Sequence, residues 1–339
     1  MLDAAFAASL NLPHSCKSGN CGSCRARLHS GEIYYPNGTP LGLSQTEALE
    51  GLVLLCQARA RSDVCIETFD VTPVEQARIK RLPARIERAL PLSHDVMGLY
   101  LRLPAAEDFR FEAGQYIDIM LKQGRRRSFS IASPPHDSRL LELHVRRVAG
   151  GEFSGPLFDA DARNGLLAIE GPLGQFVYRP GGARMLLVGG GTGLAPMLSI
   201  MRHVVESGIE RDMTLYWGVR SERDLYAHAV LEDLAGRAGR ASGARAEGAR
   251  AAALRYFPVL SEPSPEWRGL RGWVHEAVLR DIDDLCDYDV YAAGPPAMID
   301  AVRRDFSRSG AAPDRLYFDS FDYAPDSLER QRSSAATKS

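Results

Sequence analysis

The 339-residue sequence has few cysteines, little excess charge and no long apolar run. Six cysteines without a signal peptide do not suit a disulfide-stabilised secreted scaffold, so we expect reduced thiols. Lysine and arginine total 41 against 43 acidic residues, and the formal charge of −2 excludes a general attraction to nucleic acid or anionic membranes. No apolar segment is long enough to cross a bilayer. The first ten residues carry no basic lead or cleavage site, so we expect a cytoplasmic protein without nucleic-acid or membrane partners.

Four of the cysteines have a spacing that bears on function. Cys16, Cys21 and Cys24 form the pattern C-x4-C-x2-C, and 31 residues separate this group from Cys56. This is the plant-type spacing for a [2Fe–2S] cluster, in which one loop supplies three thiolates and a distant segment supplies the fourth. A structural zinc site usually has two short cysteine pairs, and a disulfide would need oxidising surroundings. The cluster is therefore favoured over both alternatives.

The N-terminal residues predict the elements around this loop. We expect a helix capped by Asp3 and running to about Leu10, a strand pair over Arg25–Tyr35 turning at Ser30-Gly31, and strands over Val53–Ala60, which carries Cys56, and Asp63–Phe69. A helix, a cysteine loop and then strands resemble the plant-type ferredoxins. Ferredoxins of this kind begin with a hairpin of roughly twenty residues, which this sequence lacks. We therefore hypothesise that the true start lies upstream, and an in-frame hairpin-like segment there would support this.

The other two cysteines and one histidine have simpler interpretations. We expect Cys65, in a strand, and Cys286, in a turn, to be buried or half-buried as small apolar residues. His14 precedes the cysteine loop, but its spacing does not require it as a ligand. We expect it to be structural or to tune the surroundings of the cluster.

From Pro83 onward the pattern changes to short strands separated by turns, which is typical of a small antiparallel barrel. Within it, Arg127-Ser128-Phe129-Ser130 resembles the R-x-[YF]-S motif of the ferredoxin–NADP reductase-like flavoproteins. The resemblance implies that Arg127 pairs with the FAD pyrophosphate, Phe129 stacks on the flavin and Ser130 lies near the flavin N5. A planar guanidinium, an aromatic face and a small hydroxyl donor suit these roles. The predicted strands are Ala84–Ala89, Val96–Leu103, Tyr116–Leu121, Arg127–Ile131 and Leu140–Val148.

A second segment continues this resemblance. The strand containing His144 and Val145 leads into Gly150-Gly151-Glu-Phe-Ser154. In the family this begins a helix whose N–H groups meet the phosphates, with Ser154 as the natural cap. The resemblance thus implies cofactor contacts from His144, Val145, Gly151 and Ser154. Together the two motifs predict FAD binding.

After Pro180 the pattern becomes α/β. The apolar strand Met185–Val188 runs into Gly191-Thr192-Gly193 and Pro196, followed by a helix through Val205. A strand, a glycine turn and a helix present backbone N–H groups to a pyrophosphate. The segment resembles the G-x-G-T-G-x-A-P motif of the same flavoproteins, which implies nicotinamide dinucleotide binding with Thr192 as an added donor.

The next strand, Met213–Val219, contains Gly218 and is followed by Arg220. A standard Rossmann fingerprint has an acidic residue here, so the sequence favours the reductase type of nucleotide domain. Arg220 or Arg223 could contact a 2′-phosphate or the pyrophosphate, which leaves NADH and NADPH both open. Residues 236–253 are rich in alanine, glycine and arginine, and we expect a surface expansion between a helix and the strand Leu254–Leu260.

Two C-terminal segments complete the resemblance. Gly294-Pro295-Pro-Ala-Met298 is similar to the family's C-G-P-P-x-M turn against the nicotinamide, but Ala293 stands where many relatives have cysteine. Leu316–Phe321 resembles the terminal strand. This implies that Phe321 covers the other flavin face and that Asp319 lies beside the active centre. An ordinary edge strand is the alternative interpretation.

To about residue 324, the chain resembles the reductases of the ferredoxin–NADP reductase superfamily that carry an N-terminal ferredoxin domain. These include reductase components of bacterial oxygenases, and the greatest similarity is to the CDP-6-deoxy-delta-3,4-glucoseen reductases. The resemblance implies that NAD(P)H reduces FAD and that single electrons pass through the [2Fe–2S] cluster to a dehydratase or oxygenase component. A non-catalytic or cluster-deficient flavoprotein is the alternative from another class.

The implied fold is multidomain, α+β and α/β. Its parts are a truncated β-grasp ferredoxin domain over residues 1–72, a linker over 73–82, an antiparallel FAD-binding barrel over 83–178, a parallel α/β NAD(P)H-binding domain over 179–324, and a disordered tail over 325–339.

Overall fold

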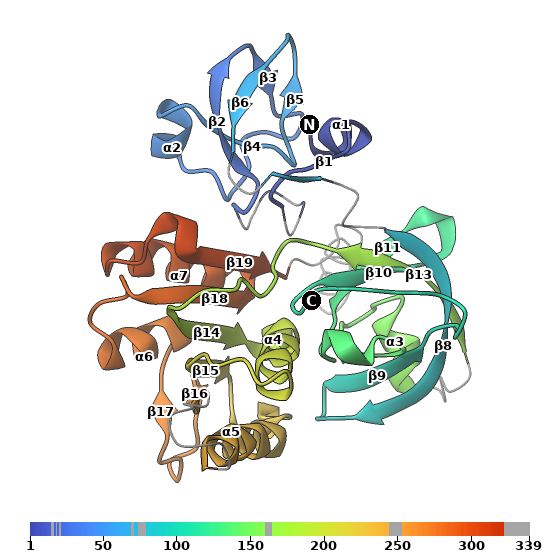
Figure 1. Ribbon diagram of the computed structural model, residues 1–339, viewed down its shortest axis with the longest axis vertical. Helices are drawn as coiled ribbons and strands as arrows, with labels where there is room; N and C mark the ends of the chain where they lie inside the picture. Colours follow the sequence, from blue (N-terminus) through green and yellow to red (C-terminus); the bar gives the residue numbers. More distant parts are fainter. Residues whose placement is uncertain are drawn as a thin grey trace, which may run out of the picture.

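The computed structural model describes residues 1–14, 17, 19, 22–68, 71–73, 79–159, 165–243 and 253–321. Three lobes are visible, with the N-terminal lobe placed above a β-barrel and an α/β lobe that lie beside each other (Figure 1). Cys16, Cys21 and the predicted tail lie outside the described residues. Within these ranges, no helix is both long enough and apolar enough to span a membrane.

The N-terminal lobe consists of short elements around a small apolar core. These are α1 (Leu2–Ala7), β1 (Leu10–Asn11), β2 (Arg25–Ser30), β3 (Ile33–Tyr34), α2 (Gln45–Leu49), β4 (Leu52–Leu54), β5 (Arg59–Ala60), β6 (Cys65–Glu67) and β7 (Thr72–Pro73). The strands form a sheet of order β4-β2-β6 and two pairs, β3-β5 and β1-β7. Leu54 and Leu55 are fully buried at the centre, together with Cys24. Cys24, the third cysteine of the predicted loop, therefore lies inside the lobe's core.

Strand pairing in this lobe differs from the prediction over residues 25–35. Strand β2 pairs with β4 and β6, whereas β3 pairs with β5, so the expected hairpin is wrong. The reason lies at Gly31, which has a φ of +91° and where a Cβ would lie 2.1 Å from the carbonyl oxygen of Asp63. The chain leaves β2 packed against the segment that enters β6, and glycine allows this close approach.

Two further details of the lobe correct the sequence prediction. Helix α1 starts at Leu2 with Met1 at its N-cap, so Asp3 lies in the first turn and is not the cap. Cys56 lies in a turn between β4 and β5 and not within a strand over 53–60, because the N–H of Gln57 returns to the carbonyl oxygen of Leu54 at 3.2 Å.

Cys65 and Cys286 are both exposed, so the prediction that they are buried or half-buried is wrong. Strand β6 alternates between exposed and half-buried positions, and Cys65 occupies an exposed one. Cys286 belongs to a turn stabilised by Asp284, whose Oδ1 accepts the Cys286 N–H at 2.9 Å. The thiol of Cys286 donates to Oδ2 of the same carboxylate at 3.3 Å.

The middle lobe confirms the predicted antiparallel barrel. Its strands are β8 (Lys80–Pro91), β9 (Val96–Arg102), β10 (Tyr116–Met120), β11 (Arg126–Ser130), β12 (Leu140–Arg146) and β13 (Leu166–Leu173), with the short helix α3 (Ser154–Asp159). They follow the order β11-β10-β13-β8-β9-β12, and a bridge between Ile131 and Leu143 joins the two ends of the sheet. Alternate residues of β8, namely Leu82, Ala84 and Ile86, point into the core, as a period of two requires.

The third lobe confirms the predicted parallel α/β arrangement. Its strands are β14 (Arg184–Gly190), β15 (Met213–Val219), β16 (Leu254–Leu260), β17 (Leu270–Arg271), β18 (Tyr288–Gly294) and β19 (Leu316–Ser320), and its helices are α4 (Leu194–Glu206), α5 (His228–Gly243), α6 (Val274–Asp281) and α7 (Pro296–Arg308). All strand pairs are parallel, in the order β17-β16-β15-β14-β18-β19. Separate apolar cores form with α4 and α5 on one side and with α6 and α7 on the other. Strand β14 is buried throughout after its first residue, because helices cover both faces of the sheet.

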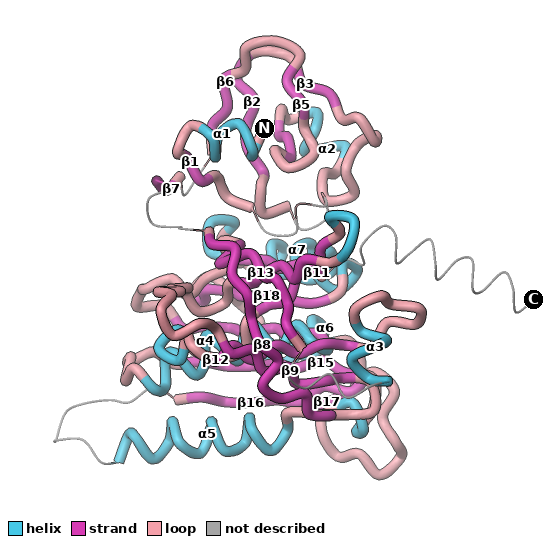
Figure 2. The backbone as a smooth tube through the Cα atoms, turned by 90° about the vertical axis from the view of Figure 1, so that its right-hand side faces the viewer, coloured by secondary structure: helices cyan, strands magenta, loops and turns pink. Residues whose placement is uncertain are grey.

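Helix α5 extends to Gly243, into the segment predicted as a surface expansion from residue 236. Ala238 is buried at 2% exposure against the α/β core, so at least this part of the alanine-rich segment is packed. Alanine and arginine are good helix formers, which explains how the helix continues. Together, α5 and β16 lie at the end of the molecule farthest from the N-terminal lobe (Figure 2).

A buried polar network joins the barrel to the α/β lobe. Arg202 of α4 donates to Oε2 of Glu142 at 2.6 Å, and Nε2 of His144 lies 3.1 Å from Oε1 of the same carboxylate. Nδ1 of His144 lies 3.0 Å from the hydroxyl of Tyr226. Burial opposes the ionisation of Glu142, but His144 and Arg202 outweigh it and lower its pKa to about 2.

This network predicts a pH-dependent effect of Glu142→Gln. At neutral pH the change leaves the half-buried Arg202 without its carboxylate, and we expect the free energy of unfolding to fall by about 3 kcal/mol. The ionised carboxylate stabilises the fold fully above pH 4.5, and this stability is lost as the pH falls toward 2. The difference between the variant and the wild type should therefore shrink over that window. Urea unfolding at several pH values measures it, with the exposed Glu112→Gln as control. A difference independent of pH would contradict this account.

Candidate functional site

The predicted nucleotide residues meet at the carboxyl edge of the parallel sheet. Gly190, at the end of β14, lies beside Gly218 of β15, and Gly294, at the end of β18, lies beside Ser320 of β19. A Cβ on Gly190 would lie 2.6 Å from the sulfur of Met298. Without side chains of their own, these glycines let Met298 and Val274 pack closely onto the backbone at this edge.

The turn after β14 requires glycine twice. Gly191 has a φ of +54°, and a Cβ on Gly193 would lie 2.0 Å from the carbonyl oxygen of Ala293. Thr192 is half-buried between them, and Pro196 is buried in the first turn of α4. Beyond β15, the predicted Arg220 is exposed. Pro295 is exposed beside the half-buried Met298 at the start of α7. The backbone N–H groups of this turn and the nearby arginine provide donors for a dinucleotide.

The three predicted catalytic residues come together where the barrel meets the sheet. The hydroxyl of Ser130 donates to Oδ2 of Asp319 at 3.4 Å, and these residues are 7% and 6% exposed. Phe321, two residues after Asp319, is half-buried, and its N–H donates to the carbonyl oxygen of Gly294 at 2.9 Å. Residues 189 positions apart thus form one buried polar contact.

The rest of the R-x-F-S segment lies on β11. The rings of Phe129 and Phe153 lie 5.3 Å apart, and Arg127 is half-buried. Ser128 is exposed, and its hydroxyl donates to Oδ1 of Asp118 at 2.6 Å. A guanidinium, an aromatic ring and a hydroxyl in alternation provide donors and a stacking surface that suit a flavin dinucleotide.

The second predicted segment is placed differently from what the sequence indicates. Ser154 is the first residue of α3 and not its cap, and its Oγ accepts the Val148 N–H at 3.0 Å because the loop folds back on itself. The Val145 side chain is fully buried in the barrel core. His144 is committed to the network between the lobes, while Gly151 is half-buried before α3.

Arg146 is a functional candidate that the sequence prediction missed. It follows the predicted His144 and Val145, and a Cβ on Gly191 would lie 3.0 Å from its Nη1. Its Nε lies 3.3 Å from Oδ2 of Asp95. The guanidinium therefore extends from the barrel to the glycine turn of the other lobe. Its position at the end of a strand, next to two predicted contact residues, was the signal available in the sequence.

In the described part of the N-terminal lobe, Cys24 is buried and Cys56 is half-buried. Burial raises the pKa of the Tyr35 phenol. The Leu55 N–H donates to the carbonyl oxygen of Cys24 at 3.0 Å, so Cys24 lies beside the residue that precedes Cys56. The backbone is left-handed at Lys17, Gly19 and Gly22, with φ values of +53°, +87° and +74°. Cys24, at the end of this tightly turned loop, and Cys56, in the turn after β4, fit two ligands of a cluster.

His14 packs beside this loop. Its Nδ1 lies 2.8 Å from the carbonyl oxygen of Leu12, and its own carbonyl oxygen accepts the Gln175 N–H at 3.3 Å. Burial lowers the pKa of the imidazole to about 4, so the ring is neutral at neutral pH. His14 thus takes part in the contact between the N-terminal lobe and the end of β13.

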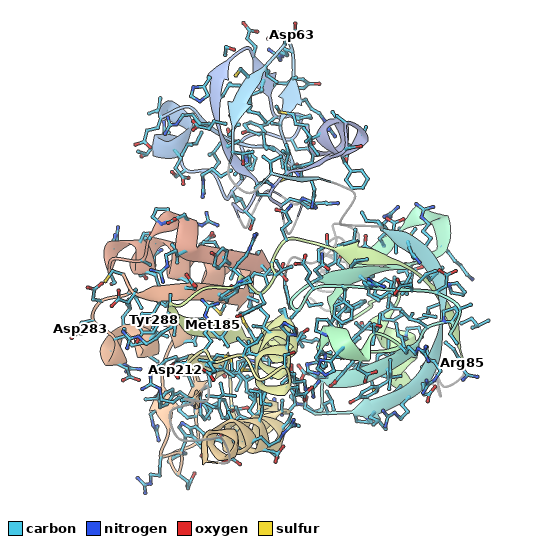
Figure 3. All side chains as sticks on the ribbon, in the orientation of Figure 1. Asp63, Arg85, Met185, Asp212, Asp283 and Tyr288 are labelled. Carbon is cyan, nitrogen blue, oxygen red and sulfur yellow. The ribbon has the colours of Figure 1, made fainter. Side chains whose placement is uncertain are left out.

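A polar cavity of about 560 Å³ lies at the opposite edge of the parallel sheet. Its lining includes Arg184, Asp212 and Arg255, at the amino ends of β14, β15 and β16. Figure 3 labels Met185, Asp212 and Tyr288 at this amino edge. Because the glycine turns lie at the carboxyl ends, this cavity is separate from the site described above.

Three sequence families match consecutive parts of the chain. A 2Fe-2S iron-sulfur cluster binding domain matches residues 1–61, an oxidoreductase FAD-binding domain matches 83–178, and an oxidoreductase NAD-binding domain matches 187–304. These matches bear out the predicted cofactors: a [2Fe–2S] cluster, FAD and NAD(P)H.

Characterised relatives and solved structures cover nearly the whole chain. The CDP-6-deoxy-L-threo-D-glycero-4-hexulose-3-dehydrase reductase of Yersinia pestis is 35% identical over 321 residues, which are 95% of this chain and 92% of that protein. The aromatic O-demethylase reductase subunit of an Amycolatopsis species is 35% identical over 329 residues, which are 95% and 93% of the two chains. The crystal structure of the Amycolatopsis cytochrome P450 reductase GcoB superposes with a TM-score of 0.75 and 33% identity, covering 94% of this chain and 93% of that one. The chain belongs to the family of NAD(P)H-dependent iron–sulfur flavoprotein reductases, which pass electrons to a partner protein.

Proposed function

We propose that this reductase supplies electrons to a dehydrase that acts on a CDP-6-deoxy-4-hexulose. The observation that carries the proposal is the 35% identity with the Yersinia pestis reductase along 95% of the chain. The three matched domains together would supply the nucleotide, flavin and cluster sites that electron delivery to a partner uses.

Delivery of electrons to an oxygenase is a second candidate, because the Amycolatopsis O-demethylase subunit is equally 35% identical. The two functions share their redox chemistry and differ in the acceptor protein. The surface around the cysteine loop would choose between them through its shape and charge complementarity.

We assign the cofactors to the residues as follows. Thiolates of Cys16, Cys21, Cys24 and Cys56 hold the cluster. Arg127, Ser128, Phe129, Ser130, His144, Val145, Gly151 and Ser154 contact FAD, of which Val145 contributes only its backbone. Gly191, Thr192, Gly193, Pro196, Gly218, Arg220, Gly294, Pro295 and Met298 contact the nicotinamide nucleotide. When bound, FAD accepts a hydride from NAD(P)H and releases its electrons one at a time, as the cluster requires.

We assign the protein's part in hydride transfer to Ser130, Asp319 and Phe321. Asp319 accepts a hydrogen bond from Ser130 in a buried position, which holds the hydroxyl in one orientation. An oriented donor beside the accepting atom stabilises developing charge without reorganising at the moment of reaction. Phe321 supplies an aromatic face at the end of β19 and helps to exclude water.

An acceptor assay tests the proposed function. The purified reductase is mixed anaerobically with a CDP-6-deoxy-4-hexulose dehydrase and its substrate, and separately with an oxygenase component, using NADH and NADPH in turn. We expect nucleotide oxidation coupled to deoxygenated sugar in the first mixture, at a rate that exceeds the leak without acceptor. Coupled turnover with the oxygenase alone would contradict the proposal and support the second candidate.

Substitution of Ser130 tests the hydride-transfer assignment. Ser130→Ala removes one oriented donor, and we expect flavin reduction by NAD(P)H to slow by roughly 10²-fold while FAD stays bound. Stopped-flow absorbance measures the rate, and the flavin-to-protein ratio confirms occupancy. An unchanged rate would remove Ser130 from the mechanism.

Cys56→Ser tests the cluster assignment, with Cys65→Ser as a matched control because Cys65 is exposed on β6 and is not a proposed ligand. Replacing one of four thiolates should bleach or shift the cluster absorption and lower the iron and acid-labile sulfide content, while FAD is retained. The control should keep both. An unaltered cluster in the Cys56 variant would refute its role as a ligand.

A further inference from the structure

The α/β lobe contacts the cysteine loop directly through α7 and β19. The hydroxyl of Ser23 donates to the carbonyl oxygen of Phe318 at 3.0 Å, between residues 295 positions apart. Nη1 of Arg303, on α7, donates to the carbonyl oxygen of Gly42 at 3.2 Å. Figure 1 shows α7 and β19 beneath the N-terminal lobe, on the side that faces it. The segment that carries Cys24 is therefore held by the nucleotide-binding lobe as well as by its own.

The guanidinium of Arg303 packs onto the backbone of the loop. A Cβ on Gly22 would lie 3.1 Å from Cζ of Arg303 and 2.9 Å from Nη2 of Arg25. Gly22 also has a φ of +74°. A side chain here would therefore displace the arginine, so glycine allows a cation to lie two residues from Cys24.

The charged groups near Arg303 leave its guanidinium facing the loop. Its side chain is 18% exposed, and its guanidinium lies 5.4 Å from the ring centroid of Phe318. Oδ1 of Asp300, whose side chain is 50% exposed, is 3.8 Å from Nη2. Solvent screens that exposed carboxylate more than it screens the buried side of the guanidinium. The second cation, Arg25, pairs with Glu47 at 2.9 Å.

Strand β19 connects this contact to the flavin-site candidates. Phe318 receives the hydrogen bond from Ser23, and the next residue, Asp319, receives the one from Ser130 on the barrel. Phe318 accepts through its backbone carbonyl oxygen and Asp319 through its carboxylate, so adjacent residues of one strand serve both contacts.

A cluster held by four thiolates is anionic and gains another negative charge when it is reduced. A fixed cation close to it stabilises the reduced form more than the oxidised form, especially where water is excluded. We propose that Arg303 is a positioning residue that holds residues 22–24 against β19 and raises the reduction potential of the cluster. This inference rests on the proposed function, because it requires the cluster that we assign to the loop.

Redox titration of the full-length protein, followed by the absorption and electron paramagnetic resonance of the cluster, tests the inference. Arg303→Leu should make the cluster harder to reduce, with at least a tenfold change in its one-electron equilibrium, which corresponds to about 59 mV. Arg303→Lys keeps the charge and should restore most of the wild-type potential. Arg304→Leu is the matched control, because Arg304 neighbours it on α7, is 54% exposed and pairs with Asp305. The control and the flavin potential should not change.

An Arg303→Leu potential equal to that of the wild type would overturn the inference, and so would an equal shift in Arg304→Leu. If the leucine variant is isolated without its cluster, Arg303→Gln removes the charge and keeps an amide donor, and an unchanged potential there overturns the inference as well. If NAD(P)H reduces no cluster in the wild-type protein, the proposed function and this inference are overturned together. If NAD(P)H reduces the wild-type cluster but the Arg303 variant keeps the wild-type reduction potential, this inference alone is overturned.

Discussion

The buried hydrogen bond between Ser130 and Asp319 lies where the barrel meets the parallel sheet, and the rest of the candidate site is arranged around it. It joins the end of β11 to β19, and the neighbouring Phe318 accepts from the cysteine loop. The parallel sheet places Ser320 of β19 beside Gly294, so the same strand also borders the glycine edge. A shift of β19 by one residue would exchange the faces of Phe318 and Asp319. Such a shift would separate the flavin-site candidates from both the nucleotide edge and the cluster loop.

The network of Arg202, Glu142 and His144 supports this arrangement from the adjoining strand β12, which the bridge between Ile131 and Leu143 joins to the end of β11. Its members are buried or half-buried, and each has a partner of complementary charge or hydrogen-bonding capacity. A buried charge without such a partner would be strongly unfavourable, so the network favours one relative position of the two lobes. This fixed position matters because hydride transfer requires two cofactor sites on different lobes to face each other.

Motifs whose conformation depends mainly on residues close by in the chain were predictable from the sequence. The strand bounds Met213–Val219 and Leu254–Leu260 agree with the structure, since short runs of mostly apolar residues are typical of strands in a parallel sheet. The glycines at 191 and 193 also followed from their pattern, and the structure gives the physical reasons in a left-handed φ and a close carbonyl oxygen. Errors occurred where distant segments decide the local conformation. Gly31 lies close to the carbonyl oxygen of Asp63. The hydroxyl of Ser154 accepts the Val148 N–H and does not cap the helix.

By itself, the sequence determined the order of the three domains, their cofactors and most residues that we assign to them, because spacing and residue type depend on chemistry that is local to each motif. Only the tertiary structure decided that Ser130 meets Asp319, that Arg146 reaches the glycine turn of the other lobe and that Arg303 lies on the cysteine loop. These contacts join residues from different lobes. Their positions depend on how whole sheets and helices pack, and no local pattern encodes that packing.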